Sequence, residues 1–136
     1  ICHASAKDGT SPEMMGPALE KLGFRVRSGV WQGAEASWDI LNHWINDMGL
    51  PVLVDWFSEF HNHYDGHYSV AFKLNQRHIW LADPEPHLKK ERIRKIQRED
   101  FLRAWHDWRG NYLERKSDLF SYWWLVAFRA PLSKIK

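Results

Sequence analysis

The sequence is poor in the features that mark several classes of protein. It has a single cysteine, Cys2, so no internal disulfide can form, and we expect a protein of a reducing compartment, the cytoplasm. No apolar run approaches the roughly 20 residues of a membrane-spanning helix, so we expect no membrane contact. The net charge of +2 is too small to indicate a nucleic-acid partner.

What the sequence does contain is enough apolar material for one folded domain. Hydrophobic residues make up 44% of the 136 residues and charged residues 26%, a balance that is typical of globular proteins. We therefore expect a single domain over residues 1–136. Most of the nine tryptophans should pack in the core, whereas Trp56 and Trp108 could line a substrate cleft.

Helical and strand patterns follow one another in an order that indicates an α+β fold. Residues 10–13, Thr-Ser-Pro-Glu, have the pattern of a capping box, and Gly23 is a stop signal, so a first helix should lie between them. A second helix is expected over residues 35–48 and a short third one over 98–105. Strands are expected at residues 24–27, 51–57, 68–72, 78–82, 92–96 and 122–128.

Two of these strands carry the residues of greatest chemical interest. His67 opens the strand 68–72, and Asp83 follows the strand 78–82. The short segment between the strands predicts an antiparallel hairpin. Opposed residues in such a pair have Cβ atoms about 4.5–5.5 Å apart, the arrangement in which a carboxylate orients an imidazole. The alternative is that His67 is a polar strand end and Asp83 simply begins a turn.

The register of this hairpin decides whether the two side chains meet. If His67 and Asp83 face each other, the loop has an odd number of residues, about three, centred on Asn75. A two-residue loop of Asn75 and Gln76 would place the side chains on opposite faces of the sheet. Asn75 tolerates the left-handed conformation that the longer loop requires. We therefore expect both side chains on one face, within hydrogen-bond reach or one water apart.

Five collinear segments carry a resemblance to a known family. They are Asp8-Gly9-Thr10-Ser11-Pro12-Glu13 leading into Ala18-Leu19-Glu20-Lys21-Leu22-Gly23-Phe24, Gly49-Leu50-Pro51-Val52-Leu53-Val54, Gly66-His67-Tyr68-Ser69-Val70, Leu81-Ala82-Asp83-Pro84, and Glu99-Asp100-Phe101-Leu102 before Trp105. They cover nearly the whole chain. In this order they resemble the papain-like cysteine peptidase domain of bacteriocin-exporting ABC transporters and its stand-alone relatives, which cut leader peptides after a Gly-Gly pair.

The resemblance implies a papain-like α+β fold, in which N-terminal helices pack on an antiparallel sheet, and the activity of a cysteine peptidase. In that family the histidine of the Gly-His-Tyr motif is the general base, and the aspartate of the Asp-Pro motif orients it. These roles fall on His67 and Asp83. No metal or organic cofactor is implied. The implied partners are a peptide or protein substrate and, in the intact protein, an ABC transporter.

The nucleophile is the point at which the chain departs from the family pattern. Family members carry the catalytic cysteine at the start of an N-terminal helix, followed by glycine and preceded by an oxyanion-hole glutamine. Cys2 lies only seven residues before Gly9, is followed by His3 and has no glutamine ahead of it. We therefore expect the first helix, with the nucleophile, to be missing from this chain and to lie upstream of Ile1. The chain alone should then be inactive.

Such a missing helix would leave apolar surface without a partner. We expect this surface on the helix of Met14, Met15 and Leu19, and as an apolar trough beside His67. Cys2 should then lie beyond hydrogen-bond range of the His67 ring and react as an ordinary thiol.

Two other functions are open at this stage. A non-catalytic relative would keep the fold and bind peptides without cutting them. A metal-dependent hydrolase would use His61 and His63, with His67 and Asp65 nearby in the sequence, because imidazole and carboxylate groups are zinc ligands. His61 and His63 lie in a polar loop without fixed helical spacing, so solvated histidines are the simpler interpretation.

Overall fold

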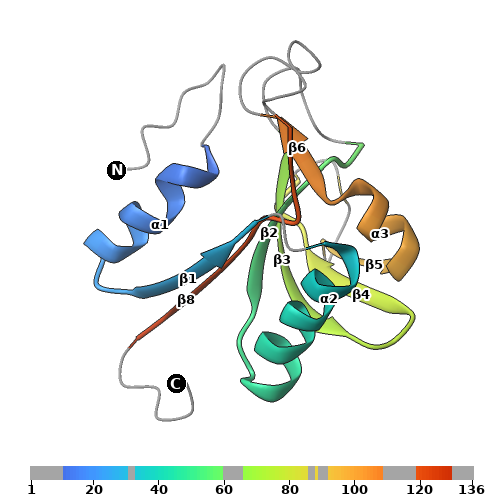
Figure 1. Ribbon diagram of the computed structural model, residues 1–136, viewed down its shortest axis with the longest axis horizontal. Helices are drawn as coiled ribbons and strands as arrows, with labels where there is room; N and C mark the ends of the chain where they lie inside the picture. Colours follow the sequence, from blue (N-terminus) through green and yellow to red (C-terminus); the bar gives the residue numbers. More distant parts are fainter. Residues whose placement is uncertain are drawn as a thin grey trace.

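A six-stranded antiparallel sheet forms the centre of the structure (Figure 1). The structure is a computed structural model, and it describes residues 11–30, 33–59, 66–85, 88, 92–108 and 119–129. The strands are arranged in the order β1-β8-β2-β3-β4-β5, and each neighbouring pair is antiparallel. Their bounds are β1 Arg25–Gly29, β2 Val52–Trp56, β3 His67–Leu74, β4 His78–Ala82, β5 Ile93–Gln97 and β8 Trp124–Phe128.

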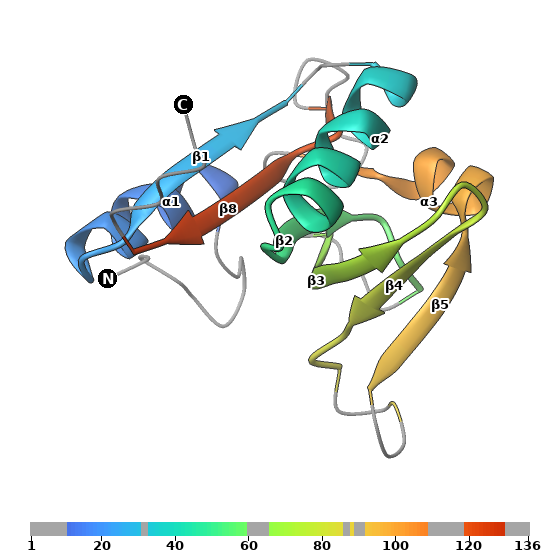
Figure 2. The ribbon, with the colours of Figure 1, turned by 90° about the horizontal axis from the view of Figure 1, so that it is seen from below.

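Helices lie on both faces of this sheet. α1 (Pro12–Lys21) packs along β1 and β8 at one end. α2 (Ala34–Asn42), its continuation η1 (His43–Asp47) and α3 (Arg98–Ala104) lie over β2 to β5 (Figure 2). In the part of the chain that the structure describes, no helix has the length and apolar character needed to cross a membrane.

The two faces of the sheet differ in how much apolar surface they bury. The larger cluster lies under α2, η1 and α3, and Leu41, Leu81 and Phe101 at its centre have no exposed surface. The smaller cluster lies under α1, around Trp123 and Leu125. Because apolar burial is the main favourable contribution to folding, the larger cluster holds β2, β3 and β4 firmly in place.

The start of α1 differs from the sequence-based prediction. Its N-cap is Ser11, whose side chain makes no capping hydrogen bond, and Pro12 follows at the first helical position. Glu13 is therefore two residues after the N-cap instead of three, and the predicted capping box is wrong.

The second predicted helix, over residues 35–48, changes its winding part of the way along. Its last part, η1, is a π-helix in which the Met48 N–H donates to the His43 carbonyl oxygen, 3.0 Å away. Trp44 and Ile45 in this segment are buried in the larger cluster. The wider turn therefore keeps the apolar face of the helix on the sheet.

A small second sheet was not predicted. β6 (His106–Trp108) pairs antiparallel with β7 (Leu119–Ser121), and strands of three residues are too short to give a clear alternation of polar and apolar residues. The last strand was predicted from residue 122 but begins at Trp124. Tyr122 has a φ of 59°, in the left-handed region, which interrupts extended backbone. The other predicted elements are present, with ends shifted by at most two residues.

Candidate active site

His67 and Asp83 meet at one end of the β3–β4 hairpin. His67 is the first residue of β3, and Asp83 directly follows β4. Nε2 of His67 lies 2.5 Å from Oδ1 of Asp83, and the two side chains are 11% and 0% exposed. The predicted hydrogen-bond contact is confirmed, whereas the catalytic role of the pair stays a prediction.

The hairpin contains two registers that are separated by a bulge. Near the turn Leu74 pairs with Ile79, whereas near the site Val70 pairs with Ala82. The registers differ by one residue because β3 accommodates one extra residue, Phe72. Because of the extra residue, the alternation of side chains between the two faces of the sheet is shifted by one residue across the bulge.

The turn is not the predicted three-residue loop. The Asn75 N–H donates to the His78 carbonyl oxygen at 3.0 Å, so the turn closes around Gln76 and Arg77. Oδ1 of Asn75 accepts hydrogen bonds from the N–H groups of Arg77 and His78, both at 2.8 Å. By itself this two-residue loop would place the two site residues on opposite faces of the sheet.

The bulge reverses the effect of the turn. Extending the register near the site by one residue places Asp83 opposite Ser69, two residues from His67 along β3. Residues two apart on a strand share a face, so His67 and Asp83 are diagonal neighbours on one face of the sheet. The prediction that they share a face is confirmed, and the prediction that they are directly opposed is wrong.

Both carboxylate oxygens of Asp83 are held in place. Oδ1 also accepts a hydrogen bond from the Glu85 backbone N–H at 3.0 Å, and Oδ2 accepts one from Nη1 of Arg94 at 3.3 Å. Because an ionised carboxylate only accepts hydrogen bonds, Nε2 of His67 is the donor in the 2.5 Å contact. The neutral ring then has its basic lone pair on Nδ1, the tautomer in which Nδ1 can take up a proton.

Trp56 supports the His67 ring from the protein interior. The two residues are register partners in β2 and β3, and their ring centroids lie 6.2 Å apart in an edge-to-face arrangement. The indole N–H of Trp56 donates to Oγ of Ser69 at 3.0 Å. Trp56 is only 4% exposed, so the prediction that it lines a substrate cleft is wrong. The side chain of Trp108 lies outside the described residues.

One buried carboxylate binds the backbone of Gly66, directly before His67, and a second lies where a side chain on Gly66 would point. Oδ2 of Asp107 accepts a hydrogen bond from the Gly66 N–H at 2.7 Å. A Cβ atom on Gly66 would lie 2.7 Å from that oxygen and 2.7 Å from Oδ1 of Asp55, so no side chain fits without movement. The backbone that leads into His67 is therefore fixed by a side chain of β6.

His106, beside Asp107, has a different environment. Its ring stacks on Phe57, with centroids 5.4 Å apart and 16° between the ring planes. Burial lowers the pKa of His106 below its usual 6.5, and the backbone hydrogen bond with Arg103 and the charge of Asp107 offset this only in part. The neutral form of the ring therefore predominates at pH 7.

The sequence pointed to His67 and Asp83 but not to Arg94 or Asp107. Arg94 faces inward between two exposed residues of β5, but the sequence does not show this, because its neighbour Ile93 is apolar and yet exposed. Asp107 lies in a strand of three residues, which gave no pattern to follow. Its role depends on pairing between distant segments.

The apolar surface predicted on α1 is partly covered. Met14 is exposed, whereas Met15 and Leu19 pack against the smaller cluster. A cavity of about 350 Å³ opens between α1, β1 and Trp123. The apolar trough beside His67 stays a prediction.

Several other predictions concern residues outside those described. Cys2, His61 and His63 all lie there, so the distance of Cys2 from His67 is not tested. Within residues 11–30, 33–59, 66–85, 88, 92–108 and 119–129, no three histidine, cysteine, aspartate or glutamate side chains are grouped so that they could hold a metal ion.

Known structures resemble this fold, although sequence comparison finds no relative. No protein-family model matches the chain, and no curated protein matches it either. The peptidase domain of Streptococcus ComA, described as a bi-functional ABC transporter involved in a quorum sensing pathway, matches with a TM-score of 0.58 at 20% identity. The match covers 93% of this chain and 72% of that one.

The peptidase domain of Streptococcus mutans ComA also matches with a TM-score of 0.58 at 20% identity, over 96% of this chain and 82% of that one. In this chain, as predicted, helices pack on a six-stranded antiparallel sheet. The chain therefore has the papain-like α+β fold of these peptidase domains.

Proposed function

We propose that this protein is a cysteine peptidase that removes leader peptides after a Gly-Gly pair, with His67 as general base and Asp83 as the residue that orients it. The observation that carries the proposal is the 2.5 Å hydrogen bond between Nε2 of His67 and the buried carboxylate of Asp83. The fold shared with the ComA peptidase domains supports it.

The chemistry follows from the tautomer of His67. Nδ1 takes the proton of a cysteine thiol, and the thiolate attacks the carbonyl carbon of the scissile peptide bond. His67 returns that proton to the leaving amine, which leaves an acyl-enzyme. A water molecule then attacks the thioester, gives one proton to His67 and releases the peptide acid, and His67 returns this proton to the thiolate. Asp83 holds the ring and stabilises its protonated form throughout.

The cysteine that supplies the thiol is part of the proposal. We propose that it lies upstream of Ile1, because Cys2 is followed by His3 and not by the glycine of the family pattern. We further propose that the substrate is a peptide and that the protein is attached to, or associates with, an ABC transporter. This proposal is by analogy with ComA, which is described as an ABC transporter.

The test is hydrolysis of a synthetic leader peptide with a Gly-Gly site by the protein carrying its natural N-terminus. We expect cleavage that iodoacetamide abolishes, and a decrease in kcat of about 10²- to 10⁴-fold for Asp83→Ala, because the ring then loses its hydrogen-bond acceptor and its charge partner. Asp100→Ala is the matched control, since Asp100 is exposed and pairs with Arg103.

Each of the other possible outcomes would contradict a different part of the proposed function. Full activity of Asp83→Ala would overturn the roles proposed for the pair. Peptide binding without cleavage by the wild-type protein would instead favour the non-catalytic alternative. Activity that chelators abolish and iodoacetamide leaves intact would favour the metal-dependent hydrolase. Loss of activity in Cys2→Ser would place the nucleophile at Cys2.

A further inference from the structure

The Asp83 carboxylate is held by an arginine from the neighbouring strand. Arg94 lies on β5, opposite Leu81 of β4, and its Nη1 contacts Oδ2 of Asp83 at 3.3 Å. Oδ1, the other oxygen, faces His67. A carboxylate with a partner on each oxygen cannot rotate about its Cβ–Cγ bond without breaking one contact. The direction in which Oδ1 points is therefore coupled to Arg94.

The guanidinium of Arg94 is itself held from two further sides. Its carbon lies 5.1 Å from the centroid of the Trp56 ring, and its Nη2 pairs with Oε1 of Glu59 at 2.5 Å. Trp56 is also the ring that supports His67. The Trp56 indole therefore contacts both His67 and Arg94, the arginine that binds Asp83.

The charges of this group balance when the base is protonated. Protonated His67 and Arg94 contribute two positive charges, and Asp83 and Glu59 contribute two negative ones. Without Glu59, the positive Arg94 beside Asp83 would weaken the stabilisation that the carboxylate gives to the protonated ring. Glu59 therefore allows Arg94 to position Asp83 without opposing the proton on His67.

We propose that Arg94 is a positioning residue, which fixes the orientation of the Asp83 carboxylate and thereby of the His67 ring, with Glu59 as its counter-charge. The catalytic meaning of this arrangement rests on the proposed peptidase function. The positional claim does not, because it concerns the hydrogen bond between His67 and Asp83 itself.

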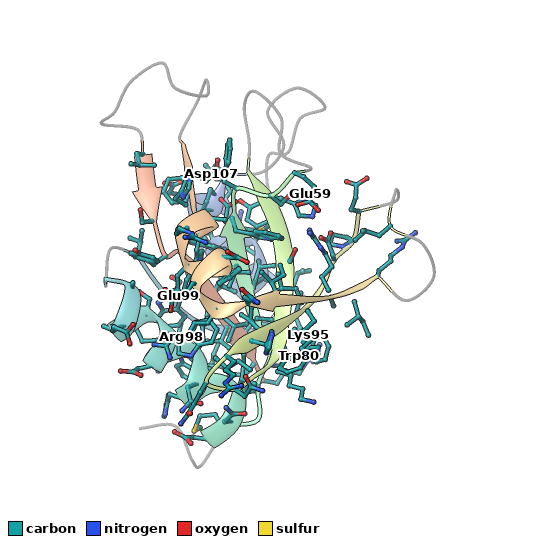
Figure 3. The ribbon with its side chains drawn as sticks, turned by 90° about the vertical axis from the view of Figure 1, so that its right-hand side faces the viewer. Glu59, Trp80, Lys95, Arg98, Glu99 and Asp107 are labelled. Atoms are coloured by element: carbon teal, nitrogen blue, oxygen red, sulfur yellow. The ribbon has the colours of Figure 1, made fainter. Side chains whose placement is uncertain are left out.

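The chain offers a closely matched control in Arg98. The Arg98 side chain is 21% exposed and that of Arg94 is 20% exposed. Arg98 lies over the Trp38 ring at 5.0 Å and pairs with Glu35 at 2.5 Å. Figure 3 shows Arg98 in the lower part of the molecule, whereas Glu59 lies near the upper end of the sheet. Arg98 thus repeats the stacking and the ion pair of Arg94 away from the site.

The experiment compares Arg94→Gln, Arg94→Lys and Arg98→Gln in the full chain. The main readout is the proton resonance of the His67 Nε2–H group, assigned with a His67→Gln variant. The same variants, with the natural N-terminus present, are assayed for kcat and KM. Lysine keeps the positive charge but lacks the planar fork of donors, so it separates charge from geometry.

We expect Arg94→Gln to move the His67 resonance upfield and to lower kcat about 10- to 100-fold with little change in KM, since a displacement of ~1 Å can cost that much. Arg94→Lys should recover part of both effects, and Arg98→Gln should change neither. If Arg94→Gln does not fold, Glu59→Gln replaces it, because Glu59 is mostly exposed. It should move the same resonance in the same direction by less.

An unchanged His67 resonance in Arg94→Gln, or in its replacement Glu59→Gln, would overturn the proposal. Equal effects in Arg94→Gln and Arg98→Gln would also overturn it, because they would show a general loss of packing. A shifted resonance in a protein without peptidase activity would support the positioning role and refute only the proposed function.

Discussion

His67 and His106 are placed alike in the fold but have opposite surroundings. Each is the first residue of a strand, and each ring contacts an aromatic side chain at the end of β2, Trp56 for His67 and Phe57 for His106. Nε2 of His67 faces the buried carboxylate of Asp83. The His106 ring is stacked and partly buried, and this burial lowers its pKa.

The difference shows that the surroundings of a histidine, more than its position on a strand, decide what it can do. Stacking and burial favour the neutral imidazole, whereas a neighbouring carboxylate favours the charged form. A general base must hold a proton during part of the reaction. Of these two histidines, His67 has the environment for that task.

The largest expected effect comes from replacing each histidine in turn. His67→Ala should lower kcat about 10²- to 10⁴-fold, the usual contribution of a general acid–base group. His106→Ala should retain activity within about threefold once its lower stability is corrected for, because a partly buried ring that stacks on Phe57 mainly contributes packing. Peptide hydrolysis by the protein with its natural N-terminus, at a temperature where both variants are folded, measures both. Equal losses would show that His106 takes part in the chemistry.

Gly66→Ala tests the connection between the two regions, which runs through Asp107. The added Cβ would lie 2.7 Å from the carboxylate oxygens of Asp107 and Asp55, so the backbone before His67 must shift. We expect a loss of about 1–3 kcal/mol in the free energy of unfolding, the usual range for overpacking. Activity should fall further than the loss of folded protein explains.

Gly16→Ala is the control for this substitution. Its Cβ would lie 3.6 Å from Cγ1 of Val26, an ordinary contact, and alanine favours a helix over glycine by about 0.5–1 kcal/mol. Stability should therefore stay the same or rise, with unchanged activity. If Gly66→Ala behaves like Gly16→Ala in urea unfolding and in hydrolysis, the contact with Asp107 does not position His67.

The sequence was sufficient to predict the two residues of the site, His67 and Asp83. It was not sufficient to predict the hairpin register that brings them together. The strand patterns around His67 and Asp83 were sufficient for a hairpin, and the family motifs carried the same two residues. The parity of the hairpin depends on Phe72, which is an apolar strand residue like Val70 and Ala71 before it and gives no sign of a bulge. The error in the turn and the missing bulge cancelled, so the shared face was predicted correctly for an incorrect reason.

The supporting residues could not be predicted from local patterns, for two different reasons. Arg94 is only 11 residues from Asp83 and reaches it because β5 pairs with β4, but the apolar residue beside it, Ile93, is exposed, so the residue pattern of β5 does not show which face points inward. Asp107 reaches Gly66 from β6, 41 residues along the chain, and β6 has no strand pattern of its own. Local sequence patterns predict helices and strands, whereas contacts of this kind follow from the packing of the whole sheet.

The smallest expected effect is on the pH dependence of stability, and we expect it to arise from His106. The pKa of His106 in the folded protein lies below its usual 6.5, so between these two values the unfolded chain binds more protons than the folded one. Stability therefore rises with pH across this window and falls on acidification through it.

His106→Gln removes the titrating group and should flatten this part of the curve. Urea unfolding of both proteins from about pH 8 down to about pH 5, a range that spans the titration of a histidine, measures the difference. The same steepness in His106→Gln would mean that the acid sensitivity arises elsewhere, and the contrast between the two histidines would then rest on geometry alone.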